Sequence, residues 1–161
     1  MKDPSQRHWP CLSQLLVRSQ PPLKIFTLLG THMTVDNIVD CLRNMPELAV
    51  MSGDRLLFST TILEALTPSI NPMKVPHCPM LAMIGLKGEP ASFKFPALTA
   101  MIYSRWKLSK QQRNGERLGF DVKIPAVEVV ELPEDLEFRS RFLQSQELAE
   151  CIKDGLELWY A

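Results

Sequence analysis

Apolar residues in the first third of the chain are spaced as in two short helices. Residues 23–29 form an almost continuous apolar run that Gly30 ends, which is typical of a buried helix closed by a glycine. Thr34 can cap a second helix, because the apolar residues from Val35 to Leu42 recur at helical spacing. We therefore predict one helix before Gly30 and a second helix directly after Thr34.

The pattern then changes to two β-prone runs, a short helix and a proline-rich stretch. Residues 48–51 and 55–58 flank a turn that contains Gly53, and this spacing indicates a hairpin. Residues 60–66 are predicted to form a short helix. Residues 67–80 contain four prolines, so we expect an ordered crossing loop there and place the only internal boundary in it.

The second half of the chain alternates short apolar runs with one longer helical pattern. Residues 81–86, 120–122 and 127–130 are strand-like. Residues 97–106 are compatible with two states, because their Ala and Met residues favour a helix whereas an Ile-Tyr pair favours a strand. Acidic residues in a first turn and an apolar stripe at spacings of three and four predict a C-terminal helix over residues 134–154.

These elements predict an α+β fold within one compact domain, residues 1–161. We expect residues 1–20 to be an extended N-terminal arm and residues 21–66 to be a winged-helix-like unit. The crossing loop of residues 67–80 then leads to an α+β part, residues 81–161. In this arrangement the winged-helix-like unit packs on a small mixed sheet and on the C-terminal helix, so each amphipathic element buries its apolar side.

A resemblance to a known family supports the order of the N-terminal elements. The run LLG, the run LRNMPELAVMSGDRLLF and the following Ile62-Leu63 resemble a winged-helix segment of the peripheral subunits of RNA polymerase III. The resemblance covers residues 21–63 and implies a winged-helix fold, with a function in transcription or in another nucleic-acid machine. It assigns nothing to residues 67–161.

The outward side of the predicted second helix indicates a protein interface. Its polar residues are Asp36, Asn37, Asp40 and Arg43. Helices that read the major groove bring cations and amides to bases and phosphates, whereas two outward carboxylates repel phosphates. We therefore expect this face to bind protein in preference to nucleic acid.

A basic segment with interleaved aromatic residues is the main alternative binding surface. Residues 81–125 have a net charge of +5, and residues 126–161 have a net charge of −6. Such a segment can hold single-stranded nucleic acid or an anionic membrane surface. The other interpretation is that it pairs with the acidic C-terminal helix of the same molecule. The basic segment comprises Tyr103, Arg105, Trp106, Lys107, Lys110, Arg113 and Arg117.

Residues that support metal binding or catalysis do not form a recognisable motif. His8 and Cys11 are three residues apart and His77 is next to Cys78, but structural zinc sites have two ligand pairs of the first kind. No nucleophile elbow, phosphate-binding loop or paired-carboxylate motif is present. We therefore predict a protein that is not an enzyme and that uses no metal and no cofactor.

The last residues of the chain are unusually apolar. Trp159 and Tyr160 follow an apolar stripe, whereas free termini are commonly polar and frayed. We expect this tail to be docked, either on the core of its own domain or on a partner.

Size, charge and cysteine usage complete the functional expectation. The 161 residues carry 18 basic and 18 acidic side chains, so the net charge implies no polyanionic partner. The four cysteines are scattered among apolar residues, as free thiols in a reducing compartment are. No apolar stretch is long enough to span a membrane.

We predict an intracellular protein of the nucleus or cytoplasm that is a binding or assembly subunit of a larger complex. Association with nucleic acid is left open. The alternative is a self-assembling viral matrix or coat-associated protein with a basic membrane- or genome-facing patch.

Overall fold

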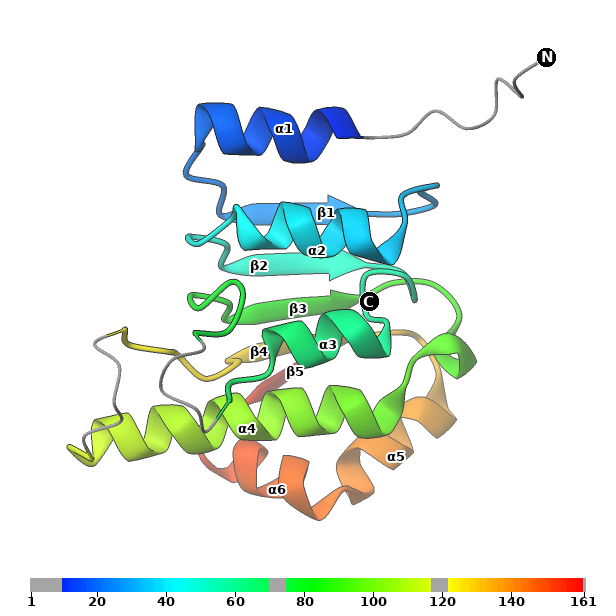
Figure 1. Cartoon of the computed structure of the whole chain (residues 1–161). Helices are drawn as coiled ribbons and strands as arrows, with labels where there is room; N and C mark the ends of the chain where they lie inside the picture. Colours follow the sequence, from blue (N-terminus) through cyan, green and yellow to red (C-terminus); the bar gives the residue numbers. More distant parts are fainter. Residues whose placement is uncertain (1–9, 70–74, 117–121, 161) are drawn as a thin grey trace.

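A parallel five-stranded sheet with helices between successive strands forms the protein (Figure 1). The structure is a computed structural model, and it describes residues 10–69, 75–116 and 122–160. The strands are β1 (Ile25–Leu28), β2 (Val50–Gly53), β3 (Met83–Leu86), β4 (Val129–Leu132) and β5 (Glu157–Tyr160). The helices are α1 (Pro10–Ser19), α2 (Val35–Arg43), α3 (Thr60–Leu66), α4 (Phe95–Arg113), α5 (Leu136–Gln144) and α6 (Gln146–Lys153), with a 3₁₀ turn at Pro90–Ser92.

The order of the strands in the sheet is the same as their order in the chain. Each strand pairs in parallel with the next, and the register aligns Ile25, Val50, Met83, Val129 and Glu157 in one row. Connections between adjacent parallel strands are right-handed, so a sheet that grows in one direction receives all its crossover helices on one face. Figure 1 shows α2, α3 and α4 on the same side of the sheet, with α1 beyond β1.

The core lies between the sheet and this single layer of helices. Alternate strand residues point to opposite faces, so Met51, Ile84 and Val130 point toward the helices and are fully buried. The helices contribute the opposite wall of the core, for example through Leu42 and Phe142. The sheet therefore has one face in the core and one face outside it.

Three helices agree with local signals in the sequence. The Thr34 side chain accepts a hydrogen bond from the backbone N–H of Asn37 at 3.2 Å, so the predicted N-cap of α2 is confirmed. The predicted helix over residues 60–66 is confirmed as α3. Residues 97–106 lie inside α4, which settles the choice between helix and strand for that segment.

The N-terminal half differs from the winged-helix expectation, which is not confirmed. The run of residues 23–29 contains strand β1 in place of the predicted helix. The predicted hairpin over residues 48–58 is wrong, because β2 is its one described strand and pairs in parallel with β1 and β3. After β2 the chain turns, and the Asp54 carboxylate accepts bonds from the N–H groups of Gly30 and Leu56. The sheet is parallel throughout the described residues, so it is not mixed in strand direction.

Three other predictions need correction or fall outside the described residues. Residues 10–19 of the expected extended arm form α1, whose Leu16 is buried in the core. The single C-terminal helix is two helices, because Ser145 leaves helical geometry and caps α6 through a bond from the N–H of Leu148. The strand-like stretch 120–122 lies mainly outside the described residues, and Val122 is not in a strand.

Buried Arg105 ties α4 to the proline-rich crossing. Its guanidinium donates to the carbonyl oxygens of Leu66, His77 and Cys78 at 2.9 to 3.1 Å, and a longer contact of 3.4 Å reaches Pro79. Burial lowers the pKa of Arg105 to about 10, so the side chain remains charged at neutral pH. These carbonyls form the electronegative cage that a buried cation requires.

Candidate functional site

The face of the sheet that points away from the helices is the most unusual surface of the protein. Parallel sheets are normally covered on both faces, whereas among the described residues no helix covers this one. We call it the open face. Its strand residues are Ile25, Thr27, Val50, Ser52, Met83, Gly85, Val129, Glu131, Glu157 and Trp159.

The open face has an apolar row and a polar row. The row nearer the amino ends of the strands runs from exposed Ile25 through half-buried Val50, Met83 and Val129 to Glu157. The second row contains Thr27, Ser52, Gly85, Glu131 and Trp159, in the same strand order. Apolar side chains from four strands therefore lie beside the polar side chains of Thr27, Ser52 and Glu131.

A polar cluster occupies the middle of the second row. Gly85 carries no side chain there, and a Cβ atom built on it would lie 2.7 Å from Oγ of Ser52 and 3.1 Å from Oε2 of Glu131. These two side chains therefore converge over the backbone of β3. The ammonium group of Lys87 forms an ion pair with the other carboxylate oxygen of Glu131, and both side chains are partly exposed. The cluster presents a hydroxyl and an oriented carboxylate to a ligand.

The described open-face residues form no recognisable catalytic or metal-binding group. Nucleophilic catalysis requires a nucleophile hydrogen-bonded to a base, and no such pair is formed by the described open-face residues. In the described part of the chain, no group of three or more His, Cys, Asp and Glu side chains could hold a metal ion. Burial raises the pKa of Cys41 to about 11 and the pKa values of Cys78 and Cys151 to about 12, which makes these free thiols poor nucleophiles.

Comparisons with known proteins do not assign the chain to a family. No family model, no curated protein and no solved structure matches the chain.

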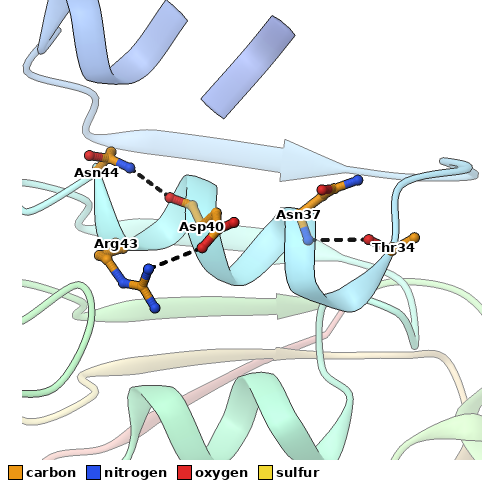
Figure 2. A network of polar contacts seen from close by, with 5 residues as sticks. All are labelled: Thr34, Asn37, Asp40, Arg43 and Asn44. Carbon is orange, nitrogen blue, oxygen red and sulfur yellow. Dashed lines mark hydrogen bonds and ion pairs between the residues drawn. The ribbon is translucent and has the colours of Figure 1, made fainter. Parts of the chain in front are cut away.

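The predicted interface on α2 is exposed but largely bonded within its own helix. The Asp40 carboxylate accepts a hydrogen bond from Arg43 at 3.1 Å, and Nδ2 of Asn44 donates to the carbonyl oxygen of Asp40 at 2.8 Å (Figure 2). The N–H of Asn37 is used by the Thr34 cap, and Asp36 lies exposed in the first turn. The α2 face therefore remains a candidate protein interface with modest bonding capacity.

The predicted basic segment is divided between the core and the surface. Arg105 is fully buried, so it cannot contact a phosphate at the surface. Trp106 is almost buried, and Lys107 and Lys110 are exposed. Arg117 lies outside the described residues.

Acidic residues of α6 and its C-terminus pair with the remaining basic segment, as our alternative interpretation stated. Nε1 of Trp106 and a guanidinium nitrogen of Arg113 both donate to Oδ2 of Asp154, at 2.8 and 2.7 Å. The Tyr103 ring stacks on Trp106, and Lys110 lies 4.7 Å from the centre of the Trp106 ring. These contacts weaken the case for a nucleic-acid or membrane surface, because one of its three exposed described cations, Arg113, is already ion-paired and only Lys107 and Lys110 remain.

Asp154 also lines an open groove. The groove has a volume of ≈ 740 Å³ and lies at the amino ends of β4 and β5. Trp106, Arg113 and Pro125 contribute to its walls. The groove is open, and Arg113 and Asp154 within it already form an ion pair, so it ranks below the open face as a candidate site.

We expect the carboxyl group of Asp154 to titrate below the usual range of aspartates. The hydrogen bonds from Arg113 and Trp106 lower its pKa, since both favour the ionised form. A carboxyl group whose pKa is lower in the folded state stabilises the fold above its unfolded pKa, and this stabilisation is lost as the pH falls through the folded pKa. Asp154→Asn should therefore reduce the pH dependence of stability below about pH 4. Urea unfolding at several acidic pH values measures this, and an unchanged pH profile would contradict the pairing.

The apolar tail is docked on its own sheet through strand β5. Val129 to Leu132 pair in register with Glu157 to Tyr160, and Leu158 packs against the core. Trp159 and Tyr160, which we predicted as interface residues, keep 50% and 51% of their surface exposed. Trp159 lies on the open face and donates to Glu157 at 3.1 Å, whereas Tyr160 stacks under Arg139 of α5.

Sequence reasoning missed the polar cluster of the open face, although the sequence contains a signal for it. Glu131 interrupts the apolar strand pattern of residues 129–132, and Gly85 interrupts that of residues 83–86. These interruptions mark the outward side of two strands. Their adjacency depends on the parallel pairing of β3 with β4, which residue spacing alone does not show.

Proposed function

We propose that this protein is a non-enzymatic protein-binding module, a subunit or adaptor of a larger complex, that binds its partner with the open face of the sheet. The observation that carries the proposal is the row arrangement on this face. Apolar side chains from four strands lie next to Ser52, Glu131 and Lys87 without any described segment over them. A contiguous, partly apolar surface with a few oriented polar groups is typical of interaction sites.

The architecture supports the same function. A parallel sheet in sequential order with one layer of helices is the arrangement of βα solenoids such as leucine-rich repeats, whose extended sheet faces bind other macromolecules. The units here begin at Ile25, Val50, Met83, Val129 and Glu157, so they differ in length. The likeness is one of architecture alone, since the sequence shows no internal repeat.

The chemistry of the open face indicates the kind of partner. Glu131 and Glu157 project from this face, and Lys87 neutralises only the first of them. A partner segment with apolar side chains for the first row and an arginine or lysine for Glu157 would match this pattern, because charge complementarity favours the correct register. Phosphate-rich nucleic acid does not match it.

The proposed compartment, the question of membrane-spanning helices and the proposed setting in transcription rest on separate observations. The buried free thiols are compatible with the reducing intracellular compartment that we propose. Among the described residues, no helix is long and apolar enough to cross a membrane. A setting in transcription depends on the sequence resemblance alone and stays a prediction.

Affinity capture from the native source tests the proposed surface. We would compare the wild-type protein with the variant Met83→Lys/Val129→Lys, in which two cations enter the apolar row. The lysine stems can lie along the sheet and keep their charged ends in water, so the fold should persist. We expect the variant to lose the captured partner while its circular dichroism spectrum stays unchanged.

The matched control also introduces a lysine, but places it on the α2 face. Asp36→Lys leaves the open face intact and should retain the partner. Loss of the partner with Asp36→Lys alone would move the interface to α2. Binding that persists in both variants but disappears in Lys107→Glu/Lys110→Glu, and that weakens steeply with salt, would favour the basic segment instead.

A further inference from the structure

The groove at the amino ends of β4 and β5 adjoins the open face. Val129 and Glu157 line the groove and also belong to the first row of the open face. The volume of the groove, ≈ 740 Å³, lies within the usual range of ligand-binding clefts, roughly 300–1,000 Å³. The groove therefore continues the surface that we propose for the partner.

Apolar side chains contribute much of the groove. Val127 and Leu156 are almost buried in its walls, whereas Met80 and Val122 keep 47% and 37% of their surface exposed. Large apolar side chains that stay exposed around a concave surface are typical of interaction sites, and methionine adapts to irregular partners. The groove therefore favours a ligand that brings apolar side chains of its own.

One wall of the groove is the segment that leads into β4, and this segment is held at both ends. Gln112 of α4 donates from Nε2 to the carbonyl oxygen of Val122 and accepts at Oε1 from the N–H of Ile124, both at 2.9 Å. At the other end the N–H of Glu128 donates to the carbonyl oxygen of Ala82 at 2.7 Å. The wall is therefore in place before a ligand binds, which lowers the entropic cost of binding.

Between these two ends, the backbone groups of Ala126 and Val127 are available. Neither residue forms a hydrogen bond with any described residue, and neither belongs to a helix or a strand. Both line the groove, where Ala126 is half-buried and Val127 is 3% exposed. Peptide groups that are shielded from water require hydrogen-bonding partners, and the main chain of a bound peptide supplies them.

The charged groups of the groove favour a basic side chain on the ligand. Arg113 and Asp154 already form an ion pair with each other. Glu128 and Glu157 line the groove at the starts of β4 and β5, and neither pairs with a cation among the described residues. The remaining charged residue of its lining, Lys123, lies between the two residues that α4 holds. The two carboxylates at the sheet therefore match an arginine or a lysine.

We propose that this groove binds an extended segment of the partner protein that carries alternating apolar side chains and one arginine or lysine. The main chain of the segment pairs with Ala126 and Val127. Its apolar side chains pack on Met80 and Val122, and its cation lies near Glu157. The inference rests on the proposed function only in taking the partner to be a protein.

Binding of short peptides to the whole isotope-labelled chain tests this site. The probe is a pool of acetylated, amidated hexapeptides with Leu, Val or Phe at alternate positions and Arg at one other position. We expect this Arg pool to shift the amide resonances of Ala126, Val127 and Gly155. A pool with Glu in place of Arg, and an Arg pool with methylated backbone amides, should each bind at least about tenfold more weakly. An Arg pool that does not bind, or that binds no better than either control pool, would overturn the proposal.

Variants of α4 and of the open face locate the binding. Ser109→Trp places a large side chain in the groove, whereas Lys107→Trp places the same side chain on the exposed side of α4. We expect Ser109→Trp to bind the Arg pool at least about tenfold more weakly, and Lys107→Trp to bind it as the wild type does. Glu128→Lys, which reverses an exposed charge without filling the groove, should cause a similar loss.

Val50→Lys separates this inference from the proposed function, because Val50 lies on the open face and outside the groove. We expect Val50→Lys to bind the Arg pool as the wild type does. Circular dichroism verifies that each variant is folded. Binding that persists in Ser109→Trp and Glu128→Lys but disappears in Val50→Lys would overturn the inference and leave the open face as the binding site.

Discussion

Arg105→Met is expected to lower the free energy of unfolding by about 3–5 kcal/mol, because several buried carbonyl groups lose their donor at once. Arg105 is fully buried and bonds to Leu66 at the end of α3 and to residues 77–79 of the crossing segment. Methionine retains most of the apolar length of the side chain, so the loss reports mainly on the hydrogen bonds. In a protein of this size the melting temperature should fall by roughly 6–20 °C, which calorimetry measures.

A neighbouring lysine provides the control for Arg105. Lys107→Met removes a cation two residues away on the exposed side of α4, and should change stability by less than about 0.5 kcal/mol. Arg105→Lys should recover only part of the loss, since one ammonium cannot match the fork of the guanidinium. Equal effects of Arg105→Met and Lys107→Met would mean that the buried bonds contribute little.

Gly53→Ala is expected to lower the free energy of unfolding by roughly 3 kcal/mol, although it adds one methyl group. The new Cβ would lie 2.5 Å from the carbonyl oxygen of Leu28 and 2.8 Å from Cδ2 of Leu57. The first of these atoms belongs to the backbone of β1 and cannot rotate away, so β1 and β2 must separate locally. Urea unfolding measures the loss, and hydrogen exchange should locate it in β1.

Gly85→Ala is the matched control for this prediction. Its Cβ would meet Oγ of Ser52 and the carboxylate of Glu131, which are ends of side chains that can rotate toward solvent. We expect a loss below about 1.5 kcal/mol, and the combination with Ser52→Ala should recover part of it. Leu57→Ala should not rescue Gly53→Ala, because the contact with the Leu28 carbonyl remains. Similar losses for both glycines would show that both sites relax equally well.

Local sequence signals predicted many of the elements and few of their contacts. The Thr34 cap, the helix over residues 60–66 and the strand predicted at residues 81–86, which is β3, agree with the structure because their determinants lie within a few residues. The apolar run at residues 23–29 carries no period that separates a buried helix from a buried strand. Pairing with β2 decides for the strand, since it supplies partners for the backbone of β1.

Two features of the candidate surfaces depended on residues far apart in the sequence. Arg105 belongs by sequence to a basic segment, but the carbonyl groups that surround it come from α3 and from the crossing segment. The open-face cluster joins Ser52 of β2, Glu131 of β4 and Lys87, which directly follows β3. Neither arrangement follows from periodicity or charge counts, because both require the order of the strands.

The sequence by itself determined a protein of mixed helices and strands, the cap of α2 at Thr34, and scattered thiols. The structure shows these thiols to be free and buried at Cys41, Cys78 and Cys151. These depend on side-chain type and short spacing, which act locally during folding. Only the tertiary structure decided that the strands pair in parallel and in sequence order, and that the helices lie on one face. Parallel pairing joins segments separated by a whole crossover, so its free energy comes from contacts that no local window contains.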